Sequence, residues 1–174
     1  MRCECTLNDG TPVILRPLHC DDLPACAEFF ACCSPRSLYS RYERLRVESP
    51  FELAKQLCFA DQDTQLAMVG ETEIDGLDRV IGIAQLLSDP RHEVAEFAVL
   101  VADAWQGLGL GSHFADFSLA LAEAWGVERL VAEFLPDNVR LIRIVESRSF
   151  KLCRDGSGQV VSAQKLLGER GRDG

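Results

Sequence analysis

The sequence predicts a single α+β domain, in which helices flank a mixed but mostly antiparallel central sheet. Short apolar or alternating runs follow one another in the middle of the chain, as in a strand meander. Longer segments carry apolar residues at helical spacing, with capping residues and prolines at their starts. The 174 residues, 47% hydrophobic and 26% charged, suffice for one full core but not for two ordinary domains. We expect the domain to span residues 1–167, and residues 168–174 to form a polar, disordered tail.

The N-terminal third is expected to form one strand and three helices. The strand covers residues 11–16, after a turn of Asn, Asp and Gly. Asp21 or Asp22 then caps a first helix near Pro24, because proline suits the first helical turn. Ser-Pro pairs start the next two helices, which we place at residues 35–45 and 50–60.

The rest of the chain is expected to complete the sheet. Three strands form an antiparallel meander, with a turn at Asp75 and Gly76 between the first two. We place these strands at residues 65–73, 79–87 and 93–101. A helix that ends at Gly126 follows. The later elements are this helix at residues 110–125, a strand at 129–134, a helix at 139–147, and a hairpin of strands at 150–153 and 160–167 around a loop at 155–158.

The most informative stretch is residues 105–112, which lies between an apolar strand and the amphipathic helix. Its glycines at positions 107, 109 and 111 allow a sharp turn and a close approach to a ligand. The first N–H groups of the following helix lack intrahelical partners, and the helix dipole favours an anion there. The pattern therefore predicts a phosphate or pyrophosphate site, with a plain glycine turn as the alternative.

A dinucleotide-binding loop is a second interpretation of the glycines. Glu133 lies about 20 residues beyond the last glycine, where a ribose-binding acid would be expected. However, the loop comes late in the chain rather than after the first strand, and the third glycine is one residue early. No Gly-Lys-Ser/Thr follows, which excludes a P-loop.

Residues 95–111 resemble the acetyl-CoA-binding motif of the GNAT N-acetyltransferase superfamily, in which Gln/Arg-x-x-Gly-x-Gly/Ala holds the CoA pyrophosphate. Residues 135–138, before an apolar helix, are similar to the next GNAT motif. The resemblance implies the GNAT fold and acetyl-CoA as co-substrate, with backbone N–H groups on the pyrophosphate and a strand edge on the pantetheine arm. It identifies the cofactor-binding residues as Val99, Leu100, Val101, Gln106, Gly107, Leu108, Gly109, Leu110, Gly111, Ser112 and Asn138. For Asn138, a helix cap is an equal alternative.

Within the superfamily, residues 34–42 and 95–97 are similar to the acetyltransferase domain of Pat-type bacterial protein lysine acetyltransferases. This likeness implies an amine acceptor, either a small molecule or a protein lysine. The chain departs from many GNAT enzymes because Ser149 precedes Phe150 in place of glycine and no tyrosine lies near the C-terminal hairpin. Its only tyrosines are Tyr39 and Tyr42, so the general acid is unassigned.

Glu96 is the candidate general base. A lysine amine of pKa about 10.4 is protonated at neutral pH, so transfer from a thioester requires a group that removes its proton. On its strand Glu96 shares a face with Ala98 and Leu100, where burial would raise its pKa toward the working range. A solvated or ion-paired glutamate is the alternative. The resemblance to Pat-type enzymes favours the base, and hence direct transfer rather than a cysteine acyl-enzyme.

Composition limits the partners. A net charge of −9 argues against binding nucleic acid through phosphates and favours a cationic partner. The eight cysteines form no disulfide or metal-binding framework, so we expect no metal. No membrane partner is expected because no apolar run approaches about 20 residues, and without a signal-peptide pattern at the N-terminus we expect a cytoplasmic protein. A homodimer is left open.

A different class of function competes with the enzyme. A GNAT-like domain that senses acetyl-CoA or pairs with another protein, without turnover, would also bind the cofactor, and the missing C-terminal tyrosine supports it. Thiol release would separate the two classes. A dinucleotide oxidoreductase, the third interpretation, would bind NAD and not CoA.

Overall fold

The computed structural model describes residues 2–42, 49–154 and 160–168. Its strands are β1 (Cys3–Thr6), β2 (Pro12–Pro17), β3 (Gln65–Ile74), β4 (Leu77–Ser88), β5 (Val94–Val101), β6 (Arg129–Phe134), β7 (Lys151–Arg154) and β8 (Val161–Leu166). Its helices are α1 (Leu23–Cys32), α2 (Pro35–Tyr42), α3 (Pro50–Cys58), α4 (Leu110–Trp125) and α5 (Val139–Glu146), with 3-10 turns η1 (Cys20–Asp22) and η2 (Asp103–Trp105). None of the helices in these ranges is long and apolar enough to cross a membrane.

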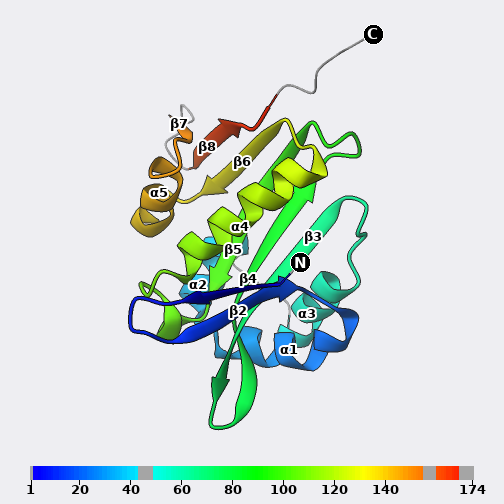
Figure 1. Ribbon diagram of the computed structural model, residues 1–174, viewed down its shortest axis with the longest axis vertical. Coiled ribbons are helices and arrows are strands. Elements are labelled where there is room, and N and C mark those ends of the chain that lie inside the picture. Colours follow the sequence, from blue (N-terminus) through cyan, green and yellow to red (C-terminus); the bar gives the residue numbers. More distant parts are fainter. Residues whose placement is uncertain (1, 43–48, 155–159, 169–174) are drawn as a thin grey trace.

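All strands belong to one sheet, in the order β1-β2-β3-β4-β5-β6-β8-β7 (Figure 1). Neighbouring strands pair antiparallel except β5 and β6, which run parallel because α4 carries the chain back between them. The expected meander is formed by β3, β4 and β5, and both residues of the turn at Asp75 and Gly76 have positive φ, 53° and 77°. The prediction of a mixed, mostly antiparallel sheet is confirmed.

Strand β1 was not predicted. It has only four residues and three of them are exposed, so its sequence shows no clear period. It forms a hairpin with β2, which places Asn8 of the connecting turn next to the glycine loop, where the Asn8 N–H donates to the Leu108 carbonyl. Helix α3 ends at Cys58, slightly earlier than predicted. The expected end of α2 near residue 45, the hairpin loop at 155–158 and the tail after Gly168 lie outside the described residues.

Helices cover both faces of the sheet and enclose two cores (Figure 1). Helix α4 carries Leu110 and Phe114 into one core, and α1, α2 and α3 build the other around Phe30. Gly82 on β4 allows α4 to approach closely, because a Cβ there would lie 2.8 Å from Phe114 Cε2 and 2.9 Å from Leu110 Cδ2. The two layers hold β5 between them, and β5 leads through η2 into the glycine loop.

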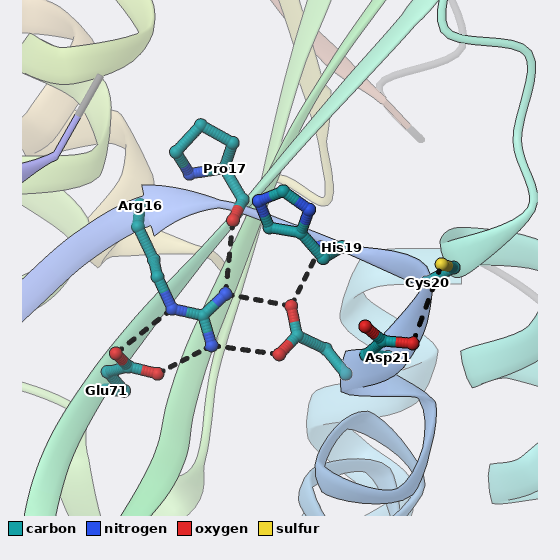
Figure 2. Close-up of polar contacts among 7 residues, drawn as sticks. Arg16, Pro17, His19, Cys20, Asp21 and Glu71 are labelled. Carbon is teal, nitrogen blue, oxygen red and sulfur yellow. Dashed lines mark hydrogen bonds and ion pairs between the residues drawn. The ribbon is translucent and has the colours of Figure 1, made fainter.

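An ion-pair cluster joins β2, β3 and η1 on the side of α1 (Figure 2). Arg16 Nη1 and Nη2 donate to the two carboxylate oxygens of Asp22 at 2.8 and 2.9 Å. Arg16 Nε and Nη2 donate to the two oxygens of Glu71 at 3.0 and 2.7 Å. The arrangement in Figure 2, with one guanidinium between two partly buried carboxylates, fixes the start of α1 against the sheet.

Candidate functional site

The candidate site begins where β5 and β6 separate. Within the described residues, their pairing stops at Glu96 and Val131. The Ala102 N–H donates to the Ile81 carbonyl of β4, whereas the Glu93 carbonyl accepts from the Arg129 N–H of β6. The N–H and C=O groups of successive residues alternate between the two sides of a strand. Val99 and Val101 therefore direct their N–H and C=O groups toward the open edge, and Leu100 directs its N–H and C=O groups toward β4.

A cleft of about 910 Å³ follows this edge. Its walls come from β5, the glycine loop, the end of β6, α2 and the start of α5. Of the site residues predicted from the sequence, all but Leu108 line it, including Glu96, Gln106 and Asn138. Leu108 instead packs against the core below α4. The fold thus brings residues from both predicted motifs to one cavity.

The three glycines of the loop have different roles. Gly107 and Gly109 have φ values of 82° and 99°, a conformation that disfavours any residue with a Cβ. Gly111 has no such constraint, but a Cβ there would lie 3.0 Å from Ile144 Cδ1. We expected all three to let a ligand approach. Gly111 lines the cleft, and the absence of a Cβ there also leaves room for Ile144 of α5.

The loop presents a series of backbone donors to the cleft. Among the described residues, the N–H groups of 107 and 109–111 have no hydrogen-bond partner, and these residues line the cleft. The Ser112 N–H, which we also expected to be available, donates to the Gly109 carbonyl at 2.9 Å. Four such donors beside the N-terminus of a 16-residue helix make a suitable site for a phosphate or pyrophosphate.

The Gln106 side chain connects the loop to the two neighbouring helices. Its Nε2 donates to the Val101 carbonyl at 2.9 Å and to Ser37 Oγ of α2 at 3.0 Å. Its Oε1 accepts from Arg140 Nη1 of α5 at 2.5 Å. Ser37 also donates to Asp103 Oδ1 at 2.9 Å, which extends the chain of hydrogen bonds to η2. Sequence reasoning did not identify Ser37, Asp103 or Arg140 individually, because no local period relates them.

Asn138 starts α5 and bridges it to α2. Its Oδ1 accepts from the Leu141 N–H at 3.1 Å, so its role as a helix cap is confirmed. Its Nδ2 lies 3.4 Å from Ser40 Oγ. Arg41, one residue further along α2, donates to Gln85 of β4 at 2.7 Å. Helix α2 is therefore attached to the sheet as well as to α5, and forms a defined wall of the cleft.

Glu96 lies at the inner end of the open edge. It is partly buried and shares its face of β5 with Ala98 and Leu100, as predicted. Tyr39 lines the same cleft and is 39% exposed. Tyr42 is less exposed, and burial raises the pKa of its hydroxyl despite the opposing effect of Arg41. A carboxylate, a phenol and the glycine loop thus share one cavity.

A mixed sheet that opens beside a helix N-terminal glycine loop defines the acyl-CoA N-acyltransferase fold class. The chain belongs to the acetyltransferase (GNAT) family, whose model matches residues 25–150. The members of this family are acetyltransferases.

Individual relatives agree with this family. Acetyltransferase PA5475 of Pseudomonas aeruginosa is 32% identical over 105 residues, which are 60% of this chain and 56% of that protein. The chain thus spans about half the length of this curated relative. The GNAT domain of S. lividans PAT superposes with a TM-score of 0.81 at 24% identity, over 95% of this chain and 97% of the domain.

A second solved structure shares the fold within a longer chain. The cAMP-binding acyltransferase of Mycobacterium smegmatis has a TM-score of 0.63 at 22% identity, over 97% of this chain and 48% of that one. Both structural likenesses establish the GNAT fold.

Proposed function

We propose that this protein transfers the acetyl group of acetyl-CoA to an amine by direct attack, with Glu96 as the general base. The observation that carries the proposal is the arrangement of the cleft. The anion-binding loop lies just beyond one end of the open β5 edge, and Glu96 lies at the other, roughly 17 Å away for five residues of extended strand. A thioester arm that follows the edge from the loop would bring its acyl group to Glu96.

The cofactor would be held mainly by backbone groups. In this proposal the N–H groups of residues 107 and 109–111 bind the pyrophosphate, and Ser112 contributes only to the helix turn. The pantetheine amides would extend the sheet by pairing with Val99 and with the Val101 N–H. The Val101 carbonyl already accepts from Gln106. Leu100 would contact the arm only where it lines the cleft.

The proposed chemistry balances its protons. The Glu96 carboxylate takes a proton from the substrate ammonium, and the neutral amine attacks the thioester carbonyl. The new C–N bond forms as the C–S bond breaks. The nitrogen then loses its second proton to water. The CoA thiolate gains a proton from water, or from Tyr39, whose phenolate is then reprotonated by water. The proton on Glu96 returns to solvent, which completes the turnover.

A protein lysine is the acceptor class we favour. The α2 segment that resembles Pat-type acetyltransferases lines the cleft beside Glu96 and includes Ser37, Tyr39 and Ser40. The likeness to the S. lividans PAT domain supports the same class. The net charge of −9 would attract a cationic polypeptide.

A thiol-release assay with acetyl-CoA, a panel of small amines and lysine peptides tests this function. We expect release that depends on the acceptor, together with formation of an acetyl-amide detected by mass spectrometry. Calorimetry with acetyl-CoA provides the binding control. No release with any acceptor, despite tight binding of acetyl-CoA, would contradict the enzyme.

That outcome would support a non-catalytic acetyl-CoA sensor of GNAT fold. One observation favours this second function, namely that the 174 residues contain no tyrosine besides Tyr39 and Tyr42. The C-terminal hairpin therefore cannot supply a phenolic proton donor. An acetyl-CoA-dependent change in protease sensitivity, without thiol release, would be its signature.

A further inference from the structure

We propose that Asp103 is a positioning residue of the cofactor site. Through Ser37 and Gln106 it holds the guanidinium of Arg140 beside the glycine loop, where this charge meets the phosphates of CoA. The inference rests on the proposed binding of CoA, and it does not depend on turnover of an acceptor.

The Asp103 carboxylate determines the direction of the hydrogen bonds around it. It accepts from the N–H and the hydroxyl of Ser34 at 2.8 and 2.7 Å, and from the Ser37 hydroxyl at 2.9 Å. A carboxylate only accepts, so Ser37 uses its single hydrogen here and presents lone pairs to its other neighbour. Burial acts to raise the pKa of Asp103, but the bonds from Ser34 and Ser37 outweigh it and lower the pKa, so the carboxylate is ionised at neutral pH.

The direction of these hydrogen bonds fixes the orientation of the Gln106 amide toward Arg140 of α5. Its Nε2 faces two acceptors, Ser37 Oγ and the Val101 carbonyl, so its Oε1 points the other way, toward Arg140. Rotating the amide by 180° would place Oε1 against lone pairs and direct N–H groups at the guanidinium. With Asp103 in place, Arg140 is bonded to an oxygen and its position is defined.

The charge of Arg140 stays available to an anionic ligand. In the described residues Arg140 forms no ion pair, whereas Arg16 and Arg148 are each paired with carboxylates. Gln106 is neutral, so its bond orients the guanidinium without neutralising it. Arg140 lines the same cleft as residues 107 and 109–111, whose N–H groups are unpartnered. A phosphate there would receive a charge-assisted hydrogen bond in addition to the backbone ones.

Calorimetric titration with CoA tests the proposal in wild type, Asp103→Asn, Arg140→Gln and the double variant. Asparagine is isosteric, but its NH₂ donates to Ser37 and reverses the order of the hydrogen bonds. We expect Arg140→Gln to weaken CoA binding about tenfold, as for loss of one charge-assisted contact, and Asp103→Asn to weaken it about three- to tenfold. In the Arg140→Gln variant, Asp103→Asn should weaken CoA binding by less than about a further twofold, because both substitutions act through the guanidinium of Arg140.

Two matched variants separate positioning from general effects. Arg143→Gln removes another arginine that lines the cleft but does not contact Gln106, so its effect should multiply with that of Asp103→Asn. Asp78→Asn, at an exposed site on β4, should leave CoA affinity unchanged. If thermal melts show that Asp103→Asn does not fold, Ser37→Ala breaks the same connection and replaces it in the cycle.

The outcomes are distinct. The positioning role would be overturned if Asp103→Asn bound CoA as tightly as wild type. It would also be overturned if Asp103→Asn weakened CoA binding as much in the Arg140→Gln variant as it does in wild type. Wild type that binds CoA but releases no thiol would remove only the enzymatic proposal and leave the positioning role standing if the cycle behaves as expected. Wild type that fails to bind CoA would overturn both.

Discussion

Removing the guanidinium of Arg16 should destabilise the protein by an amount that the ion-pair cluster in Figure 2 allows us to work out. Arg16→Met keeps much of the apolar stem but leaves Asp22 and Glu71, whose side chains are each only 14% exposed, without their shared cation. Breaking a fully buried pair costs about 3–5 kcal/mol, and the residual exposure reduces this to about 2–3 kcal/mol. For a chain of this size we expect Tm to fall by about 4–12 °C.

The pH dependence gives a second test of the same cluster. The hydrogen bonds from Arg16 lower the pKa of Asp22 below its unfolded value, despite the opposing effect of burial. A carboxyl whose pKa is lowered by folding contributes stability above its unfolded pKa, near 3.9, and loses it as pH falls through the folded pKa. The difference in unfolding free energy between wild type and Arg16→Met should therefore be full at pH 7 and shrink below about pH 4.

Urea titrations at several pH values, with thermal melts at pH 7, measure both quantities. Arg79→Met is the matched control, because Arg79 pairs with Glu28 at a site where the two side chains are 43% and 63% exposed. Its loss should cost less than about 1 kcal/mol. The reasoning is refuted if Arg16→Met costs no more than Arg79→Met, or if its cost is the same at pH 3 as at pH 7. CoA affinity should not change in either variant, because neither arginine lines the cleft.

Three further substitutions test the site and its packing. Glu96→Gln should keep CoA affinity but lower kcat/KM by roughly 10²–10⁴-fold at neutral pH, with a deficit that shrinks at high pH as solvent deprotonates the amine; a pH-independent deficit would reduce Glu96 to a positioning role. Tyr39→Phe should lower kcat about tenfold or more if this phenol protonates the thiolate, and an unchanged kcat would leave water as the donor. Gly82→Ala should destabilise the fold by about 1–3 kcal/mol in urea titrations, because its Cβ meets Phe114 and Leu110 below 3 Å; unchanged stability would mean that α4 shifts freely.

Much of the fold could be predicted because its signals are local. Ser49 caps α3 by accepting from the Glu52 N–H, and Gly126 ends α4 in the left-handed conformation. Both follow from the backbone energetics of a few adjacent residues. The strand, glycine loop and helix are also consecutive in the chain, so an anion site could be predicted before the fold was known.

Some site details could not be predicted, because the same residue type serves different contacts. Gly111 and Gly109 occupy equivalent places in the glycine pattern, but one allows α5 to pack and the other adopts a positive φ. Leu108 and Ser112 belong to the motif, but the Leu108 side chain packs against the core and the Ser112 N–H donates within the first turn of α4. Strand β1 was missed because four mostly exposed residues form a strand only when β2 is available to pair with them.

The sequence by itself determined the family of this protein and the motif residues of β5 and the glycine loop that line its cleft, since these depend on motifs that are continuous in the chain. Only the tertiary structure decided that β5 and β6 separate after Glu96, which opens the strand edge. It also decided that Asp103 meets Ser34 across 69 positions and that Arg140 meets Gln106 across 34. Such contacts arise from the packing of α2 and α5 against the loop. Periodicity and spacing describe residues that are close along the chain, so they do not predict these long-range contacts.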